Sequence, residues 1–207
     1  MISRPEMSII AGPPGAGKST VFSLRAFAGS VFNADDRAAE LNGSSYRSIP
    51  RELRLQVNRE FEAFVRDSVA NRQSFALETT LRSRVTFDQA LLAKAAGFQV
   101  FMVYVALDSF ESHLERVTRR ANAGGHSASE MTLRHIYLNS MANLRLAMRP
   151  VESGIDVLRV FDNSSYNRPA RPVLESIQGT VSNIAPDFPH WLQTALGWSD
   201  AELASYR

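Results

Sequence analysis

Short apolar runs alternate with longer amphipathic stretches along most of the chain. Five of these runs have the length expected of buried strands, and they occupy residues 7–11, 31–33, 74–77, 99–107 and 157–161. The run at 99–107 is apolar at almost every position, which is typical of a parallel strand covered on both faces. Strands that alternate with helices predict an α/β fold built on a parallel sheet.

Apolar residues recur at helical spacing between the strands. Helices are therefore expected at 20–27, 37–41, 50–70, 84–96, 110–121 and 130–148. Asp36 is expected to cap the second of these helices and Ser129 the sixth. One of Thr79, Thr80 and Ser83 is expected to cap the fourth. After the last strand, the pattern predicts a hairpin at 172–184 followed by one or two short helices.

The residues after the first strand, Gly12-Pro13-Pro14-Gly15-Ala16-Gly17-Lys18-Ser19-Thr20, fit the phosphate-binding pattern G-x-x-x-x-G-K-[ST] at every position. Gly15 and Gly17 allow successive backbone N–H groups to point inward as an anion nest, which the start of the next helix extends. Lys18 is expected to reach the β- and γ-phosphates of a nucleotide, and the Ser19 hydroxyl to ligate Mg²⁺. We therefore expect Mg-ATP to bind at Gly12, Pro13, Gly15, Ala16, Gly17, Lys18, Ser19 and Thr20.

Carboxylates follow the second and third strands, where functional residues of open α/β sheets gather. Asp35 could accept a proton from a substrate hydroxyl or hold Mg²⁺ through water. Glu78 could hydrogen-bond a polyhydroxylated or otherwise polar substrate. A wrong substrate that left such a hydrogen-bonding group unpaired would be strongly disfavoured. The same substrate-binding role is expected of the polar residues beyond it, Thr79, Thr80 and Arg82.

The helices expected at 110–121 and 130–148 carry several arginines and are joined by a Gly-Gly break, an arrangement that indicates a lid. Arg116 and Arg120 are i,i+4 neighbours. Like charges on one helix face are unfavourable unless an anion lies between them, and a polyphosphate is such an anion. Arg134, beyond the break, is expected to contact the substrate.

Two loop residues complete the candidate set. Asn163 follows the fifth strand, where the loop of a nucleotide-binding α/β fold lies near the base, so we expect it to contact the nucleotide. His126 stands beside two glycines and is expected to be structural or a weak phosphate contact. A metal role for His126 would require further ligands at suitable spacing.

Composition narrows the classes of function. The 23 Lys+Arg and 21 Asp+Glu leave a formal net charge of +2, and the arginines are scattered among acids, so no nucleic-acid footprint is indicated. Only Lys18 and Lys94 are lysines, and a compact ammonium suits a phosphate site. No apolar run approaches the roughly 18 residues of a membrane span, and the absence of cysteine fits a reducing compartment. We expect a soluble, cytoplasmic protein with one domain over 1–207, a lid at about 110–148 and a C-terminal extension at about 172–207.

Seven segments, taken in order, resemble the small bacterial zeta-toxin-like P-loop kinases. They are Ala11–Thr20, Phe32–Asp35, Ser74–Leu81, Arg116-Val117 with Arg120, Gly124-Gly125-His126, Tyr137 with Ser140, Asn143 and Leu144, and Asp162-Asn163-Ser164. The first segment alone matches many nucleotide-binding proteins, whereas the order and spacing of the whole set are specific. The resemblance runs from Ser8 to Ser164 and leaves the C-terminal segment outside it.

This resemblance implies a five-stranded parallel sheet like that of adenylate kinase, with a lid, and transfer of the γ-phosphate of Mg-ATP to a hydroxyl group. The better-known members of the family phosphorylate UDP-N-acetylglucosamine and so starve cell-wall synthesis. A separate antitoxin protein would then be a partner. The resemblance also implies a general base at Asp35, a γ-phosphate clamp at Lys18, substrate contacts from Glu78 and Thr80, and charge stabilisation by Arg116 and Arg120.

The chain departs from the family pattern in its lid. His135-Ile136 stands where small members often carry Arg-Arg, and Ala128-Ser129 replaces the usual Val-Pro after Gly-Gly-His. These departures leave the acceptor open, so a nucleoside, an antibiotic or another metabolite is an alternative substrate. A nucleotide-gated regulatory switch is an alternative of another class, although a switch does not need carboxylates at two separate strand ends.

Overall fold

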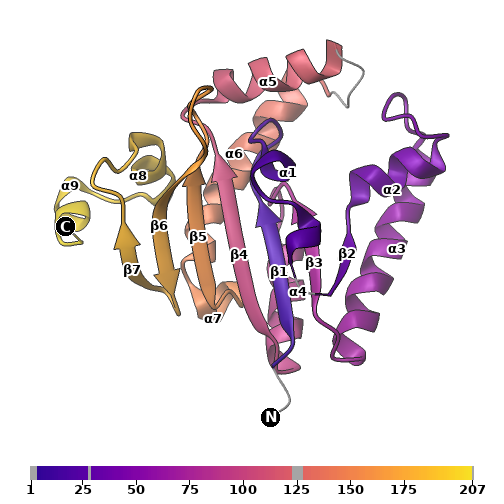
Figure 1. Ribbon diagram of the computed structural model, residues 1–207, viewed down its shortest axis with the longest axis horizontal. Coiled ribbons are helices and arrows are strands. Elements are labelled where there is room, and N and C mark those ends of the chain that lie inside the picture. Colours follow the sequence, from indigo (N-terminus) through magenta and orange to yellow (C-terminus); the bar gives the residue numbers. More distant parts are fainter. Residues whose placement is uncertain (1–3, 28, 123–127, 207) are drawn as a thin grey trace.

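The computed structural model describes residues 4–27, 29–122 and 128–206, and in it one twisted sheet organises the chain (Figure 1). Its strands are ordered β2-β3-β1-β4-β5-β6-β7. The first five in this order pair in parallel, which confirms the parallel sheet expected from the sequence. The strand bounds are β1 Glu6–Ala11, β2 Ser30–Phe32, β3 Phe75–Thr79, β4 Gln99–Ala106, β5 Val157–Asp162, β6 Arg171–Ile177 and β7 Thr180–Ile184.

The expected hairpin exists and extends the sheet. β6 pairs antiparallel with β5, and β7 pairs antiparallel with β6. The turn between them consists of Gln178 and Gly179, whose φ angles of 51° and 78° are the left-handed values that a tight hairpin turn requires. The C-terminal segment therefore continues the same sheet.

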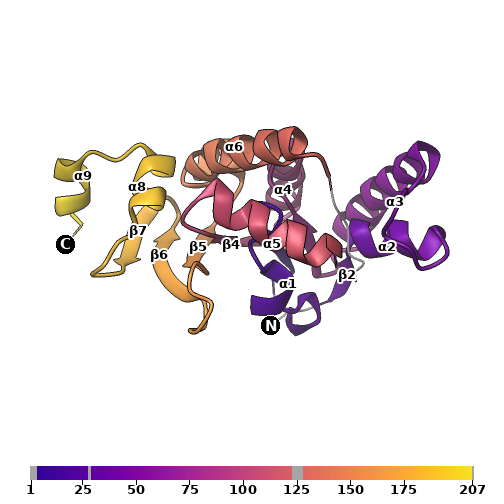
Figure 2. The same ribbon diagram turned by 90° about the horizontal axis from the view of Figure 1, so that it is seen from above.

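Most helices pack on one face of this sheet (Figure 2). Alternate residues of each strand point to that face, as Val100, Met102 and Tyr104 of β4 do, and they are almost fully buried in the main core. Helices α3, α4, α6 and α8 contribute the facing apolar residues. Their bounds are α3 Arg51–Ala70, α4 Val85–Ala95, α6 Glu130–Ala147 and α8 His190–Leu196.

The opposite face carries a thinner layer, because the helix expected at 20–27 does not form. Helix α1 spans only Lys18–Val21, the chain becomes extended at Phe22 (φ −130°, ψ 115°), and a short 3-10 turn, η1, follows at Leu24–Ala26. Extension turns the Phe22 ring onto Phe161 of β5, with ring centroids 4.8 Å apart. This aromatic contact favours leaving the helix over continuing it.

Helices α2 Ala34–Leu41 and α5 Phe110–Asn122 flank the carboxyl ends of the parallel strands, whereas α7 Pro150–Ser153 lies at the opposite end of the sheet and α9 Asp200–Ala204 lies beyond β7 (Figure 1). Helix α5 lies across the upper end of the sheet, and the arm made of α2 and α3 stands beside β2 at the sheet edge (Figures 1 and 2). No helix of the described part is long and apolar enough to cross a bilayer.

Two of the expected caps were wrong. Helix α2 begins earlier than Asp36, because the Asn33 side chain accepts hydrogen bonds from the backbone N–H groups of Asp35 and Asp36. Helix α4 begins after Arg84, and no side chain caps it. The cap expected from Ser129 is confirmed, since its side chain accepts from the N–H of Thr132.

Candidate active site

The loop between β1 and α1 has the backbone conformation of an anion nest. Gly15 and Gly17 both have positive φ, at 81° and 84°. A side chain at either position would also collide, since a Cβ would lie 2.6 Å from the His113 backbone oxygen at Gly15 and 2.6 Å from the Asn163 amide nitrogen at Gly17. Only glycine permits this loop to curl so closely between α5 and the end of β5.

The helix that follows this loop contributes less than the sequence suggests. With α1 limited to Lys18–Val21, its dipole and its free N–H groups extend over a single turn. The anion-binding capacity therefore rests on the curled loop and on Lys18 more than on a long helix.

Lys18 is buried, with 7% of its surface exposed, and its ammonium faces its own loop. Nζ donates to the carbonyl of Gly12 at 2.9 Å and to that of Pro13 at 3.4 Å, and it lies 3.5 Å from Oε1 of Glu78. Burial lowers the pKa of Lys18, while the negative charges of Glu78 and Asp35 act in the opposite direction. The lysine is thus a partly compensated cation that an incoming phosphate can attract.

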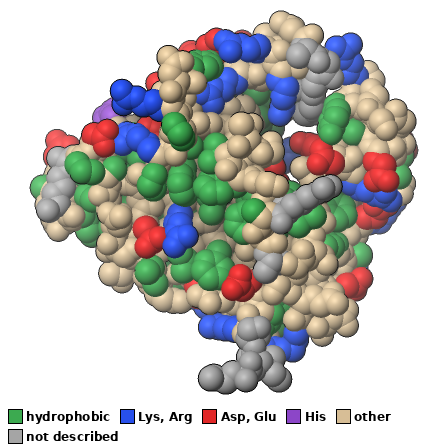
Figure 3. All heavy atoms as spheres, viewed as in Figure 1, with side chains coloured by type: hydrophobic (Ala, Val, Ile, Leu, Met, Phe, Trp, Pro, Cys, Tyr) green, Lys and Arg blue, Asp and Glu red, His purple; other side chains and the backbone are tan. Residues whose placement is uncertain are grey.

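Two of the predicted functional residues, Lys18 and Glu78, are in direct contact, although they come from different elements. The charges of Glu78 on β3, Asp35 on α2 and Arg120 on α5 all act on the Lys18 ammonium. β1 and β3 are adjacent and in register, with Ile10 opposite Glu78, so Glu78 emerges beside the loop. In Figure 3 the molecule is hollowed between α5 and the α2–α3 arm, with basic and acidic side chains at the rim.

The second lid arginine, Arg116, joins α5 to the loop after β5. Its Nη2 donates to the backbone oxygen of Asn163 at 2.8 Å, and its guanidinium lies 4.7 Å from the centroid of the Tyr166 ring. Nδ2 of Asn163 donates in turn to the carbonyl of Ala16, at 2.8 Å. The structure thus gives Asn163 a supporting contact to the phosphate-binding loop, and contact with the nucleotide stays a prediction.

Arg119 and Arg134 form ion pairs with exposed carboxylates. Arg119 is 66% exposed and bonds Glu115 at 2.7 Å. Arg134 lies near two carboxylates, Glu130 at 3.3 Å and Glu111 at 3.9 Å. A substrate contact from Arg134, which stays a prediction, would have to compete with these carboxylates.

The polar residues after Glu78 differ in what they contact. Thr79 Oγ1 accepts from the N–H of Leu81 and shares a hydrogen bond with Thr86, so it shapes the turn after β3. Thr80 is half-buried, and Arg82 is exposed. The substrate contacts expected of Thr79, Thr80 and Arg82 remain predictions.

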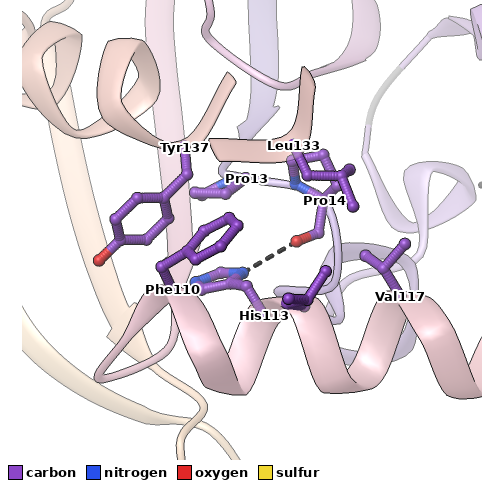
Figure 4. A pocket seen from close by; sticks show the side chains of 8 residues that line it. Pro13, Pro14, Phe110, His113, Val117, Leu133 and Tyr137 are labelled. Atoms are coloured by element: carbon purple, nitrogen blue, oxygen red, sulfur yellow. Dashed lines mark hydrogen bonds between the residues drawn. The ribbon is translucent and has the colours of Figure 1, made fainter. Parts of the chain in front are cut away.

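His113 of α5 holds the phosphate-binding loop from below and lines a small apolar pocket with Phe110, Leu133 and Tyr137 (Figure 4). Its Nε2 accepts from the N–H of Leu107 at 3.0 Å, so Nδ1 carries the proton and donates to the carbonyl of Pro14 at 2.9 Å. Burial is the main cause that lowers the pKa of His113 to about 4. The ring is therefore neutral near pH 7.

A magnesium ion fits this site as a companion of the nucleotide. The Ser19 hydroxyl is a hard oxygen ligand. Ser19 follows Lys18 at the start of α1 and is exposed to solvent. No group of three or more His, Cys, Asp or Glu in the described residues is arranged to hold a metal by itself. This donor set suits an ion that also takes oxygens from the phosphates, as Mg²⁺ does.

Sequence reasoning missed four residues that shape the site. Besides His113, these are Leu81, which has φ 54° and is fully buried, Asn143, which donates to the Leu81 carbonyl, and Tyr46, whose hydroxyl donates to Asp36. Asn143 and Leu81 carried a signal, because both belong to segments of the family pattern. His126 and its neighbouring glycines lie outside the described residues.

Comparisons with known proteins agree with this geometry. The model of the family described as Zeta toxin matches residues 2–169. A protein of Haemophilus influenzae (strain ATCC 51907 / DSM 11121 / KW20 / Rd), described as uncharacterized, is 27% identical over 127 residues, which cover 61% of this chain and 88% of that protein.

Solved structures share the fold. A structure from the PezAT chromosomal toxin–antitoxin system of Streptococcus pneumoniae matches with a TM-score of 0.62 and 19% identity, over 98% of this chain and 83% of that chain. The AvrRxo1-ORF1:-ORF2 complex with ATP matches with a TM-score of 0.65 and 19% identity, over 87% of this chain and 61% of that chain. At these identities the two matches establish the fold alone.

Proposed function

The chain belongs to the zeta toxin family of P-loop kinases, and from that premise we propose that it transfers the γ-phosphate of Mg-ATP to a hydroxyl group of a nucleotide sugar such as UDP-N-acetylglucosamine. The observation that carries this proposal is the contact between Lys18 of the phosphate-binding loop and Glu78 of β3, whose charged groups are 3.5 Å apart, with Asp35 and Arg120 within electrostatic range of the same ammonium. Phosphoryl transfer requires a phosphate clamp, a base for the attacking hydroxyl and positive charge around the transferred group. Figure 3 shows a hollow between two of the elements that supply these charges, α5 and the α2–α3 arm.

Each residue has a distinct part in the proposed reaction. Lys18 leaves the carbonyl groups of its own loop and binds the β- and γ-phosphates. Asp35 accepts the proton of the acceptor hydroxyl while the oxygen of that hydroxyl attacks the γ-phosphorus. The bond from the γ-phosphorus to the bridging oxygen breaks, and ADP leaves. Glu78 orients the acceptor, and Arg120 with Arg116 neutralises the charge that develops in transfer.

The nucleotide site has further support in the backbone. The curled loop from Gly12 to Gly17 presents N–H groups to the phosphates, and the solved AvrRxo1 complex with ATP shares the fold. Mg²⁺, held by Ser19 and by phosphate oxygens, would supply charge neutralisation. We propose that residues 1–207 act as one kinase domain, with α5 and α6 as the lid and the β6–β7 hairpin with α8 and α9 as an extension.

Acceptor-dependent release of ADP tests this function. The protein is incubated with Mg-ATP and UDP-N-acetylglucosamine, and the sugar nucleotide is examined by mass spectrometry for one added phosphate. A Lys18→Ala variant serves as the control, and it should lose the transfer. ADP release that ignores every small molecule but changes when a protein partner is added would instead support a regulatory switch.

The acceptor is tested in the same assay. If UDP-N-acetylglucosamine gains no phosphate, a metabolite extract takes its place, and a newly phosphorylated nucleoside, antibiotic or other metabolite would keep the kinase chemistry while replacing the acceptor. If expression of the protein harms cells, the harm should vanish with Lys18→Ala. A neutralising antitoxin protein would then be the partner to look for.

A further inference from the structure

The loop between α2 and α3 brings a tyrosine to the acceptor side of the site. The hydroxyl of Tyr46 donates a hydrogen bond to Oδ1 of Asp36, at 2.8 Å. Asp36 directly follows Asp35 in the first turn of α2. This contact ties the phenol to the helix turn that carries Asp35, the proposed base.

The loop is built to hold this tyrosine in place. Nδ2 of Asn42 donates to the carbonyl oxygens of Ser45 and Arg47, both at 2.9 Å, and so ties down the residues on either side of Tyr46. The backbone φ angles of Ser44 and Ser48 are 64° and 50°. Residues other than glycine and asparagine rarely adopt these left-handed values. Strained residues that persist on both sides of one side chain are typical of functional loops.

The charges around the Tyr46 hydroxyl come from both sides of the hollow. The hydrogen bond to Asp36 is the main cause that raises the pKa of Tyr46, the charge of Asp35 also raises it, and the charge of Arg120 opposes both. The hydroxyl is therefore within electrostatic range of the proposed base on α2 and of Arg120 on α5. Tyr46 is half-buried, so part of it is accessible to a ligand.

We propose that Tyr46 is a specificity-determining residue that contacts the acceptor and selects one carrying a polyhydroxylated ring. Since the phenolic proton is used on Asp36, the phenolic oxygen keeps lone pairs that accept a hydrogen bond from an acceptor O–H or N–H group. The aromatic ring adds a flat apolar surface, against which the apolar face of a sugar ring can pack. This inference rests on the proposed kinase function and adds an acceptor-binding residue to it.

A purely structural role for Tyr46 predicts a different result. If Tyr46 only braced α2 through Asp36, removing either partner of that hydrogen bond would have the same effect. If Tyr46 touches the acceptor, removing its hydroxyl affects acceptor binding more than removing Asp36 does. The two roles are therefore separated by comparing Tyr46→Phe with Asp36→Ala.

The experiment measures steady-state kinetics with UDP-N-acetylglucosamine and Mg-ATP as varied substrates, together with the Kd for Mg-ATP and the melting temperature. Tyr206→Phe is the matched control, because Tyr206 lies at the far end of the chain and packs on Trp198. The loss of one hydrogen bond to the acceptor should raise its KM by about tenfold in Tyr46→Phe. The Kd for Mg-ATP, the melting temperature and the Tyr206→Phe kinetics should stay unchanged, and Asp36→Ala should raise the acceptor KM less.

The outcomes distinguish this inference from the function on which it rests. An unchanged acceptor KM in Tyr46→Phe overturns the inference, and so does an equal rise in Tyr46→Phe and Asp36→Ala or a parallel loss of Mg-ATP affinity. In each of these cases the wild-type protein still transfers phosphate, so the kinase function stands. A wild-type protein that phosphorylates neither this sugar nucleotide nor any metabolite of an extract overturns the proposed function, and the inference falls with it.

Discussion

Nζ of Lys18 lies 3.5 Å from Oε1 of Glu78, and both groups are shielded from solvent. The contact follows from the sheet, because β1 leads into the phosphate-binding loop and β3 runs in register beside it. A carboxylate that we assign to the acceptor thus compensates the lysine of this loop. We expect phosphate oxygens and Glu78 to compete for this one ammonium group, which would link the proposed nucleotide and acceptor sites.

Glu78→Gln separates the two roles of this carboxylate. The variant removes the competitor for Lys18 while keeping a hydrogen-bonding side chain of the same size. We expect it to bind Mg-ATP at least as tightly as the wild type, and to lose acceptor-dependent transfer, since the amide no longer orients the acceptor as a charged group would. Titration calorimetry with Mg-ATP and the transfer assay measure the two effects. A tenfold weaker affinity for Mg-ATP would instead mean that Glu78 keeps Lys18 in its working position.

Asp35→Asn tests the proposed base. The amide cannot take up the hydroxyl proton, so the rate of transfer should fall by about 10²–10⁴-fold. Binding of Mg-ATP should persist, because the phosphate loop is untouched. Glu40→Gln, on the same helix and paired with Arg37, is the matched control and should keep normal kinetics. Near-normal transfer by Asp35→Asn would remove this residue from the role of base.

The sequence was sufficient for features that local pattern determines. The apolar run of β4 predicted a buried parallel strand. Val100 and the residues from Met102 to Ala106 are indeed buried in it. The phosphate loop was predicted because its glycines and lysine have to stand at fixed spacing to do their chemistry. Ser129 was recognised as a cap because a serine directly precedes the helical pattern that begins at Glu130.

Features that depend on distant contacts could not be predicted in this way. The helix after the phosphate loop ends at Val21, because Phe22 finds an aromatic partner in Phe161, far along the chain. At the start of α2 three neighbouring residues are all good caps, and only the folded backbone shows that Asn33 is the one used. The two hydrogen bonds of the buried His113 ring could not be predicted either. Both partners are backbone groups, which leave no pattern in the sequence.

The three arginines of α5 give a graded test of the lid. Arg120→Ala should lower kcat by up to about 10³-fold with little loss of Mg-ATP affinity, because charge on the transferred group is greatest in the transition state. Arg116→Ala should lower kcat as well and also weaken Mg-ATP binding several-fold, since Arg116 supports the loop at Asn163. Arg119→Ala is the control, because this exposed residue pairs with Glu115.

Transfer assays stopped at fixed times measure kcat, and nucleotide titrations measure the affinity for Mg-ATP. Equal loss of kcat in all three variants would mean that the total positive charge of the helix matters, and not the position of each guanidinium. A loss of Mg-ATP affinity in Arg120→Ala as large as its loss of kcat would place this arginine on the nucleotide in the ground state.

His113 makes the stability of the protein depend on pH. Its folded pKa of about 4 lies below the ordinary histidine value of 6.5, so between these values the unfolded chain binds more protons than the folded one. Its contribution to stability is therefore complete above about pH 6.5 and is lost as the pH falls toward 4. Between pH 7.5 and 5 this single group should lower the free energy of unfolding by about 2 kcal/mol.

The loss has a structural basis that a variant can isolate. Protonation of Nε2 removes the acceptor for the N–H of Leu107, and with it the bridge from β4 to the Pro14 carbonyl of the phosphate loop. His113→Gln cannot titrate, so its free energy of unfolding should fall less steeply over the same range, although it should be lower than that of the wild type at pH 7.5. Urea unfolding at a series of pH values measures both slopes. His190→Gln, at the start of α8 and outside the core, controls for histidines in general. Equal slopes for the wild type and His113→Gln would show that the ring takes up its proton at the same pH in the folded protein as in the unfolded chain, and the neutral bridge assigned to it would be wrong.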